Sequence, residues 1–491
     1  MSEEIKKLQP EKLWKNFYSL TQTPRPSHHE IRAVEFLKNF GESLNLETTV
    51  DEFGSVLIRK PATHGMENRK TVIIQAHIDM VPQKNEEVQH NFETDPIDAY
   101  IDGEWVTARD TTLGADDGIG VAAALTILES KDIAHGPIEV LFTATEETGM
   151  YGANGLKAGL LKGDILLNLD SETEGELYIG CAGGIDANIE FTPTKIPVPA
   201  NYTALKLYVK GLKGGHSGMD INLGRGNANK VLFRYLNIID KRWDMELADV
   251  NAGSLRNAIP REASATILIP NKNLDGIKEC VKKYEAVVKN ELGKIEPNME
   301  IGLTNAEMPK YILDAKSKFN LIKSVIACQN GVIRMSANMP GLVETSSNLA
   351  IVKSVDDKII VQCLIRSSVD SSKDALASNI EAAFLLADAK VSLDGAYPGW
   401  KPNTDSEILK LALDIYKHNF NNEAVITAVH AGLECGILGA KYLNWDMISF
   451  GPTIQHPHSP DERVNIESVQ KFFKFLTLII ENIPLSDKKH V

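Results

Sequence analysis

The sequence predicts an α/β domain that is interrupted by a large inserted α+β domain. The chain has 491 residues, more than one ordinary hydrophobic core accommodates. Its first 185 or so residues alternate apolar strands with helical stretches. Such nearly continuous apolar strands indicate a sheet covered by helices on both faces. The middle of the chain instead shows strands of alternating polarity, and one order of elements recurs there.

The strands and helices of the first part follow from hydrophobic periodicity. Residues 71–76, 138–143 and 165–169 are short apolar runs that predict buried strands. Residues 118–130 carry apolar side chains at helical spacing and predict a helix between the first two strands. The sheet of the first part is therefore expected to end in loops after residues 76, 143 and 169.

The inserted part contains two similar successions of strands and helices. The first has strands at residues 204–209 and 263–269 and helices at 228–239 and 275–292. The second has helices at 316–329 and 373–386 and strands at 348–352, 359–365 and 389–393. We expect two similar α+β units side by side. This expectation rests on element order alone, because the sequences of the two units are dissimilar.

The chain is expected to return to the first domain after a linker rich in Gly and Pro at residues 394–402. Helices at 405–419 and 466–483 and strands at 424–427 and 447–450 follow it. The predicted boundaries are residues 1–186 and 399–491 for the first domain and 187–398 for the insert.

Composition excludes several classes of function. The net charge of −14 argues against a nucleic-acid partner, and no apolar run approaches the length of a membrane span. The N-terminus is polar and shows no signal peptide. The five cysteines are scattered without CxxC spacing, as expected of reduced, mostly buried thiols. We therefore predict a cytoplasmic protein with no membrane partner.

The segment Glu146-Glu147 places two carboxylates directly after a predicted buried strand. Neighbouring side chains on an extended chain point in different directions, so one can bind a metal while the other faces a water. That division suits metal-assisted hydrolysis, in which one group holds the Lewis acid and another moves the proton. Alone, a Glu-Glu pair is common on solvated surfaces.

Other metal-binding side chains follow predicted core strands or precede a predicted helix. Each has an ordinary explanation: Asp116 could cap a helix, Asp170 could sit in a turn, and a single His is usually just hydrogen-bonded. Together they form a set of hard ligands at the edge where open α/β sheets bind ligands. Two imidazoles with three carboxylates suit a pair of divalent ions that share one carboxylate. The set is His77, Asp116, Glu147, Asp170 and His458.

In its motifs the chain resembles the aminoacyl-histidine dipeptidases (Xaa-His or cytosol non-specific dipeptidases), and it does so nearly end to end. They are a branch of the di-zinc metallopeptidases that includes aminoacylases and carnosinases. The motifs are His77-Ile78-Asp79-Met80, Gly114-Ala115-Asp116-Asp117-Gly118-Ile119-Gly120, Thr145-Glu146-Glu147-Thr148-Gly149, Leu169-Asp170-Ser171-Glu172, Gly214-Gly215-His216-Ser217-Gly218 and His458-Ser459-Pro460-Asp461-Glu462.

The resemblance implies a di-zinc peptidase catalytic domain with a mixed sheet, and an inserted lid or dimerisation domain. It implies that Asp116 bridges two metal ions, with His77 and Asp170 completing one site and Glu147 and His458 the other. Asp79 would orient His77, and a cis peptide would join Asp116 to Asp117. Asp117 stands where many relatives have Asn, and we expect no loss of chemistry because its side chain is not a ligand.

The implied activity is hydrolysis of dipeptides, of the Xaa-His (carnosine) type and other unblocked dipeptides, by a metal-bridged hydroxide. Glu146 would be the general base. His216, which without the resemblance is a loop histidine between glycines, would reach the scissile carbonyl across a homodimer interface.

Substrate recognition requires partners for the two charged ends of a dipeptide. Arg366, at the end of a predicted strand, suits a bidentate contact with the terminal carboxylate, and Asn257 would assist it. His430 and Glu434 lie near the family's region for the substrate amine, and Glu434 could hold the α-amino group.

Two alternatives stay open at this point. One is a tripeptidase or an N-acyl amino acid deacylase on the same scaffold, and the other is a metal-dependent binding protein without catalysis. Zinc is the metal that the family implies, but His and carboxylate ligands also accept manganese or cobalt.

Overall fold

The computed structural model describes residues 3–486 and divides the chain into two compact units. The first unit comprises the chain up to Gly180, Pro402–Ala428 and the chain from Leu433. The second comprises Cys181–Lys401 and Val429–Gly432. The expected boundary between residues 186 and 187 falls inside a strand of the second unit, β9 (Gly183–Phe191).

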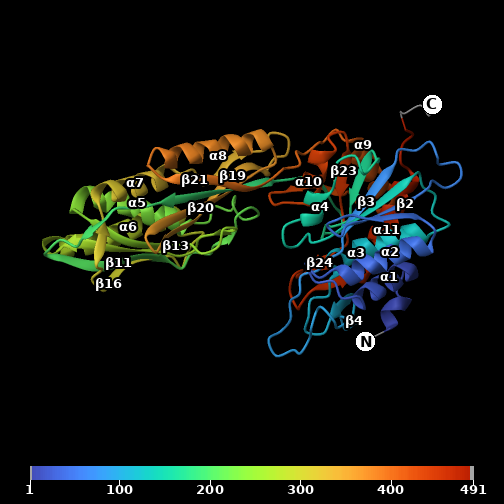
Figure 1. The fold of residues 1–491 in the computed structure, drawn as a ribbon, viewed down its shortest axis with the longest axis horizontal. Helices are drawn as coiled ribbons and strands as arrows, with labels where there is room; N and C mark the ends of the chain where they lie inside the picture. Colours follow the sequence, from blue (N-terminus) through green and yellow to red (C-terminus); the bar gives the residue numbers. More distant parts are fainter. Residues whose placement is uncertain (1–2, 487–491) are drawn as a thin grey trace. The chain divides into compact units, whose positions relative to one another are not determined.

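A mixed sheet of eight strands organises the first unit (Figure 1). Its middle strands pair in parallel in the order β6-β3-β7-β23, and β2 and β8 pair antiparallel at either side of them. All residues of β3, β6 and β7 are buried, as the uninterrupted apolar runs predict. In sheet order the strands are β1 (Glu47–Val50), β2 (Val56–Lys60), β6 (Ile138–Thr143), β3 (Val72–His77), β7 (Ile165–Asn168), β23 (Asp446–Ser449), β8 (Glu176–Cys181) and β22 (Val425–Val429).

Helices pack around this sheet, and α3 (Ala115–Glu129) is buried over nearly its whole length. Its surface is apolar all round, which is typical of a helix enclosed by other elements. The remaining longer helices are α1 (Glu11–Thr21), α2 (Ile31–Ser43), α9 (Glu407–Phe420), α10 (Glu434–Lys441) and α11 (Ile466–Glu481). The loop that carries His458 joins two strands of a small sheet. In sheet order its strands are β24 (Ile454–Gln455), β25 (Arg463–Asn465), β5 (Trp105–Ala108) and β4 (Ala99–Asp102).

The second unit is built on one sheet of nine strands with four helices (Figure 1). Four strands with α5 (Ala228–Trp243) and α6 (Leu274–Leu292) form one half, and five strands with α7 (Ala315–Ala327) and α8 (Asp370–Leu385) form the other. In sheet order the strands are β16 (Glu300–Asn305), β11 (Tyr202–Lys210), β15 (Ala263–Pro270), β13 (Glu246–Ala252), β19 (Val343–Val355), β20 (Lys358–Ser367), β9 and β21 (Lys390–Tyr397), and β18 (Gly331–Met335) pairs with β19.

The two halves of the second unit share a single core. They join where β13 pairs with β19, at Asn251 with Lys353 and Ala252 with Val352. One continuous cluster of buried apolar residues, from Ile185 to Ala389, contains side chains of both halves. The two similar units expected from element order are therefore halves of one sheet.

Most predicted elements lie within a few residues of those observed, and one prediction was wrong. Residues 394–402 were expected to be a linker, but β21 continues through Tyr397 and pairs with β9. Its Asp394-Gly395 positions accommodate an irregularity in the pairing, which the sequence shows only as turn-forming residues.

Among the described residues, no helix is long and apolar enough to cross a membrane.

Candidate metal centre

His77 ends β3, the central strand of the first unit, and its side chain is buried. Its Nδ1 lies 3.1 Å from the backbone oxygen of Asp79 and 3.5 Å from Asp79 Oδ1. A proton on Nδ1 donated to these oxygens leaves the lone pair of Nε2 free. Nε2 lies 3.1 Å from Asp116 Oδ1 and 3.3 Å from Asp170 Oδ1.

Asp116 lies at the start of α3, where the backbone departs from helical geometry. Gly114 adopts φ +72°, and the peptide between Asp116 and Asp117 is cis, as the resemblance implied. The two carboxylate oxygens of Asp116 face different histidines: Oδ1 faces His77, and Oδ2 lies 3.1 Å from His458 Nε2. One carboxylate thus belongs to two groups of side chains.

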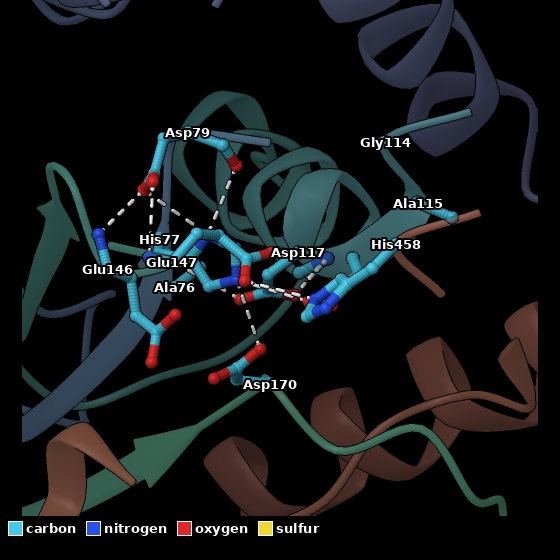
Figure 2. Close-up of polar contacts among 12 residues, drawn as sticks. Ala76, His77, Asp79, Gly114, Ala115, Asp117, Glu146, Glu147, Asp170 and His458 are labelled. Atoms are coloured by element: carbon cyan, nitrogen blue, oxygen red, sulfur yellow. Dashed lines mark hydrogen bonds and ion pairs between the residues drawn. The ribbon is translucent and has the colours of Figure 1, made fainter. Parts of the chain in front are cut away.

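Glu147 and His458 complete the second group (Figure 2). His458 Nε2 lies 3.0 Å from Glu147 Oε2, and the other Glu147 oxygen is buried without a hydrogen-bond partner. Ligand atoms lie within 4.8 Å of one another in the group His77, Asp116 and Asp170 and in the group Asp116, Glu147 and His458. The structure therefore brings together all five predicted ligands.

Negative charge is crowded at this centre. Burial raises the pKa of Asp170 to about 7, with Asp116 and Glu147 adding to the shift, and burial raises the pKa of Glu146 well above its usual range. Hydrogen bonds that His458 donates to the carboxylates of Asp116 and Glu147 raise the pKa of His458 to about 11. Carboxylates and imidazoles bind either a proton or a metal ion. The raised pKa values therefore mark side chains beside which a cation is favoured.

The side chains present fit a pair of divalent metal ions. Two imidazole nitrogens and three carboxylates, one of them shared, match the donor chemistry of zinc and related ions. The unpartnered Glu147 oxygen is a buried acceptor that a cation would satisfy.

Glu146 lies beside the ligands, and Asp79 holds the turn that carries it. Asp79 Oδ1 accepts a hydrogen bond from the backbone N–H of Glu146 at 2.9 Å, and Oδ2 accepts one from that of Glu147 at 3.2 Å. Ser27 Oγ donates to the same Oδ2 at 2.8 Å. The Asp79 carboxylate therefore fixes both glutamates as well as lying next to His77.

Comparisons with known proteins identify the family of the chain. Residues 73–482 match Peptidase family M20/M25/M40. The cytosol non-specific dipeptidase of Escherichia coli (strain K12) is 48% identical over 481 residues, which are 98% of this chain and 99% of that protein. The chain belongs to this peptidase family.

Solved structures agree with the family assignment. The aminoacylhistidine dipeptidase of Vibrio alginolyticus has 48% identity and a TM-score of 0.94, over 99% of both chains. A tripeptidase from Staphylococcus aureus has a TM-score of 0.56 at 16% identity, over 97% of this chain and 99% of that one, which shows a shared fold alone.

Glu434 begins α10 in the first unit of this M20 member. It is fully buried, and its Oε2 accepts hydrogen bonds of 2.6 Å from Gln75 Nε2 and Thr143 Oγ1. Its Oε1 has no partner, and burial raises the pKa of Glu434 to about 8.

His430, although near Glu434 in sequence, belongs to the second unit. Its Nε2 lies 2.7 Å from Ser346 Oγ. Burial, followed by the nearby charges of Arg366 and His216, lowers the pKa of His430 to about 3. The sequence placed His430 and Glu434 in one region, but the structure assigns them to different units.

Arg366 and His216 join His430 in the second unit. Arg366 is 6% exposed, donates to the hydroxyl of Tyr397 at 3.0 Å and leaves its Nε without a partner. His216 Nδ1 accepts hydrogen bonds from the backbone N–H groups of Gly218 and Met219 at 3.2 and 3.0 Å, so a proton on the neutral ring is on Nε2.

Asn257 lies beside this group through its backbone. Its carbonyl accepts a hydrogen bond of 2.8 Å from the N–H of Ser217, while its side chain is exposed. The structure therefore places the His216 loop against the Asn257 segment, and it records no side-chain hydrogen bond for Asn257.

Sequence reasoning gave no role to two buried charged residues of the first unit, Glu462 and Arg25. Glu462 ends the His458 motif, and Arg25 lies in a loop between helices. Both are at most 2% exposed. The only available signal was the position of Glu462 four residues after a predicted ligand, because a sequence does not distinguish a buried charge from an exposed one.

Proposed function

We propose that this protein is a metal-dependent dipeptidase that hydrolyses unblocked dipeptides, including Xaa-His dipeptides. The observation that carries the proposal is the pair of three-residue ligand groups that share Asp116. The near full-length similarity to two proteins named as dipeptidases supports the substrate class.

We assign His77, Asp116 and Asp170 to one divalent ion and Asp116, Glu147 and His458 to the other, with zinc as the favoured metal. When bound, the two ions would supply Lewis-acid polarisation of the scissile carbonyl and would lower the pKa of the attacking water. The ligand residues deliver this chemistry at the carboxyl edge of the parallel strands, with Asp79 orienting His77.

Glu146 is the proposed proton carrier. It is grouped with His77 and Glu147 but is not needed in either three-ligand group. Positive charge beside Glu146 lowers its raised pKa, so that the ionised carboxylate accepts a proton from the attacking water. Glu146 then delivers the proton to the leaving amine.

Substrate positioning is assigned to residues of both units. Arg366 has no carboxylate partner among the described residues, and it suits the terminal carboxylate of a dipeptide, with Asn257 and His430 beside it. The Nε2 proton of His216 suits the oxygen of the scissile carbonyl. Glu434, with its unpartnered oxygen, suits the free α-amino group.

The quaternary arrangement and location are also proposals. We propose a homodimer in which His216 serves the metal centre of the partner subunit, with the second unit acting as the lid and dimerisation domain. Cytoplasmic location is supported by the name of the Escherichia coli relative and by the scattered spacing of the cysteines, four of the five being buried.

The decisive experiment combines metal analysis of the purified protein with hydrolysis assays on a small panel. The panel contains Xaa-His and other dipeptides, tripeptides, and N-acetyl amino acids. We expect about two ions per chain and a kcat/KM for dipeptides at least about tenfold above the other classes. A preference for tripeptides or N-acetyl amino acids would establish one of those activities instead, and hydrolysis that survives complete metal removal contradicts the proposal.

A further inference from the structure

Glu462 makes an unusual set of hydrogen bonds for a residue that is no proposed ligand. Its carboxylate accepts four consecutive backbone N–H groups, and the side chain is buried. Oε2 accepts from Leu113 and Gly114 at 2.8 and 3.0 Å, and Oε1 accepts from Ala115 and Asp116 at 2.7 and 3.2 Å. Two donors on each oxygen fill the usual capacity of a carboxylate.

The four N–H groups belong to the turn that delivers Asp116, the shared carboxylate of both ligand groups. They precede the regular part of α3, where backbone N–H groups lack partners within the helix. Glu462 supplies those partners from a segment far away in sequence. The direction of the Asp116 backbone therefore depends on the placement of Glu462.

Arg25 binds the same turn through the opposite backbone groups. Its Nη2 donates to the carbonyl of Gly114, and its Nη1 donates to the carbonyls of Ile78 and Asp79 at 2.9 and 3.1 Å. A Cβ on Gly114 or Gly118 would lie 2.6 Å from Arg25 Nη2, so the two glycines make room for the guanidinium. Arg25 thereby connects the Asp116 turn to the segment that follows His77.

Glu462 is also tied to the loop that carries His458. Its backbone N–H donates to the carbonyl of Ser459 at 3.0 Å, and its own carbonyl accepts from Thr107 Oγ1 at 2.8 Å. Only three residues separate it from His458. One side chain thus connects two ligands of the same group, Asp116 and His458.

We propose that Glu462, braced by Arg25, is a positioning residue that sets the spacing of Asp116 and His458 for binding of the metal ions. The proposal rests on the proposed function of the centre. It explains why a carboxylate is buried close to Asp116, where it adds to the negative charge. Four N–H donors held in one direction require two acceptor oxygens, which a carboxylate offers and the isosteric amide does not.

The test uses the full chain and Zn²⁺ as the probe, measured by competition with a chelator of known affinity. In Glu462→Gln the amide nitrogen faces two of the four N–H donors and cannot accept from them, so two of the four hydrogen bonds are lost. Loss of an outer partner of metal ligands typically weakens metal binding about 10- to 100-fold, and we expect a rise of that size in Kd. Asp461→Asn is the matched control, because it removes a charge from the exposed neighbouring residue. Its Kd should stay within about twofold.

A second readout separates positioning from general stability. In the cobalt-substituted protein, the visible spectrum reports the geometry of the ligands, and E462Q should change it at metal saturation while D461N leaves it unaltered. If E462Q does not fold, Arg25→Lys decides, since it keeps the charge but loses the planar fork of donors. The same rise in Kd supports the proposal.

The outcomes distinguish this inference from the proposed function. If the wild-type chain binds fewer than two Zn²⁺ ions, the proposed centre itself fails. If the wild type binds two ions and E462Q, or R25K in its place, keeps its Kd within twofold with an unaltered cobalt spectrum, the positioning role of Glu462 is overturned.

Discussion

The two units of the molecule carry opposite electrostatic environments at their candidate functional residues. In the first unit, carboxylates crowd together, and burial raises the pKa of Asp170 and Glu146. In the second, Arg366 and His216 gather around His430, and burial with these groups lowers the pKa of His430. A cluster of carboxylates is suited to bind cations, whereas a cluster of hydrogen-bond donors is suited to bind an anion or a carbonyl oxygen. The difference suggests that the chemistry and the recognition of substrate are divided between the units.

The largest expected effect tests the chemical role of the first unit. Glu146→Gln removes the proposed proton carrier but keeps its size, and general acid–base groups contribute about 10²- to 10⁴-fold. We expect kcat to fall by that factor while metal content, measured by elemental analysis, stays at the wild-type value.

The control for Glu146 is Glu52→Gln, which removes a charge from an exposed residue paired with Lys157 in the same unit. It should leave kcat unchanged within about twofold. A fall of less than tenfold in E146Q would remove Glu146 as the general base and leave the acidic group with a metal-binding role alone.

A smaller effect is expected in the second unit, on binding rather than on chemistry. Arg366→Lys keeps the positive charge but loses the bidentate fork, and a hydrogen bond to a charged group is worth about 1.5–3 kcal/mol. We expect the KM for dipeptides to rise roughly tenfold to hundredfold in steady-state assays, with a smaller change in kcat.

Arg256→Lys is the matched control, because Arg256 is exposed and pairs with Asp186 in the same unit. It should leave KM near the wild-type value. If R366K lowers kcat as strongly as E146Q and leaves KM unchanged, recognition and chemistry are not divided as the two environments suggest.

The α/β class and the ligand set could be predicted because both depend on local patterns. Apolar runs such as that ending at His77 indicate buried strands, and the side chains after such strands meet at one edge of the sheet. The candidate ligands His77, Asp116, Glu147, Asp170 and His458 are therefore visible from spacing and residue type together.

Glu462, Arg25 and the division between His430 and Glu434 could not be predicted because they depend on tertiary contacts. The four N–H partners of Glu462 lie about 350 residues earlier in the chain. Residues 394–397 have turn-forming composition, yet pairing with β9 makes them part of a strand. Long-range hydrogen bonding overrides local preference at such places.

The smallest expected effect concerns the pH dependence of stability in the second unit. Burial, followed by the nearby charges of Arg366 and His216, lowers the pKa of His430 from 6.5 to about 3, and a backbone hydrogen bond to Val343 opposes this shift. The folded protein therefore binds fewer protons at His430 than the unfolded chain does between these pH values. Stability from this residue is fully present above about pH 6.5 and is lost as pH falls towards 3, by about 1.4 kcal/mol per pH unit at most.

Urea unfolding is measured with a probe that reports on the second unit. His430→Gln should reduce the slope of the unfolding midpoint against pH between about 4 and 6.5. Ser346→Ala is the control, since it removes one hydrogen bond but keeps the imidazole. It should lower the midpoint at every pH and retain most of the slope. An equal slope in wild type and H430Q would show that His430 accepts a proton without cost. The donor-rich group in the second unit would then tolerate further positive charge, and its contrast with the acidic centre would be weaker than the burial of His430 implies.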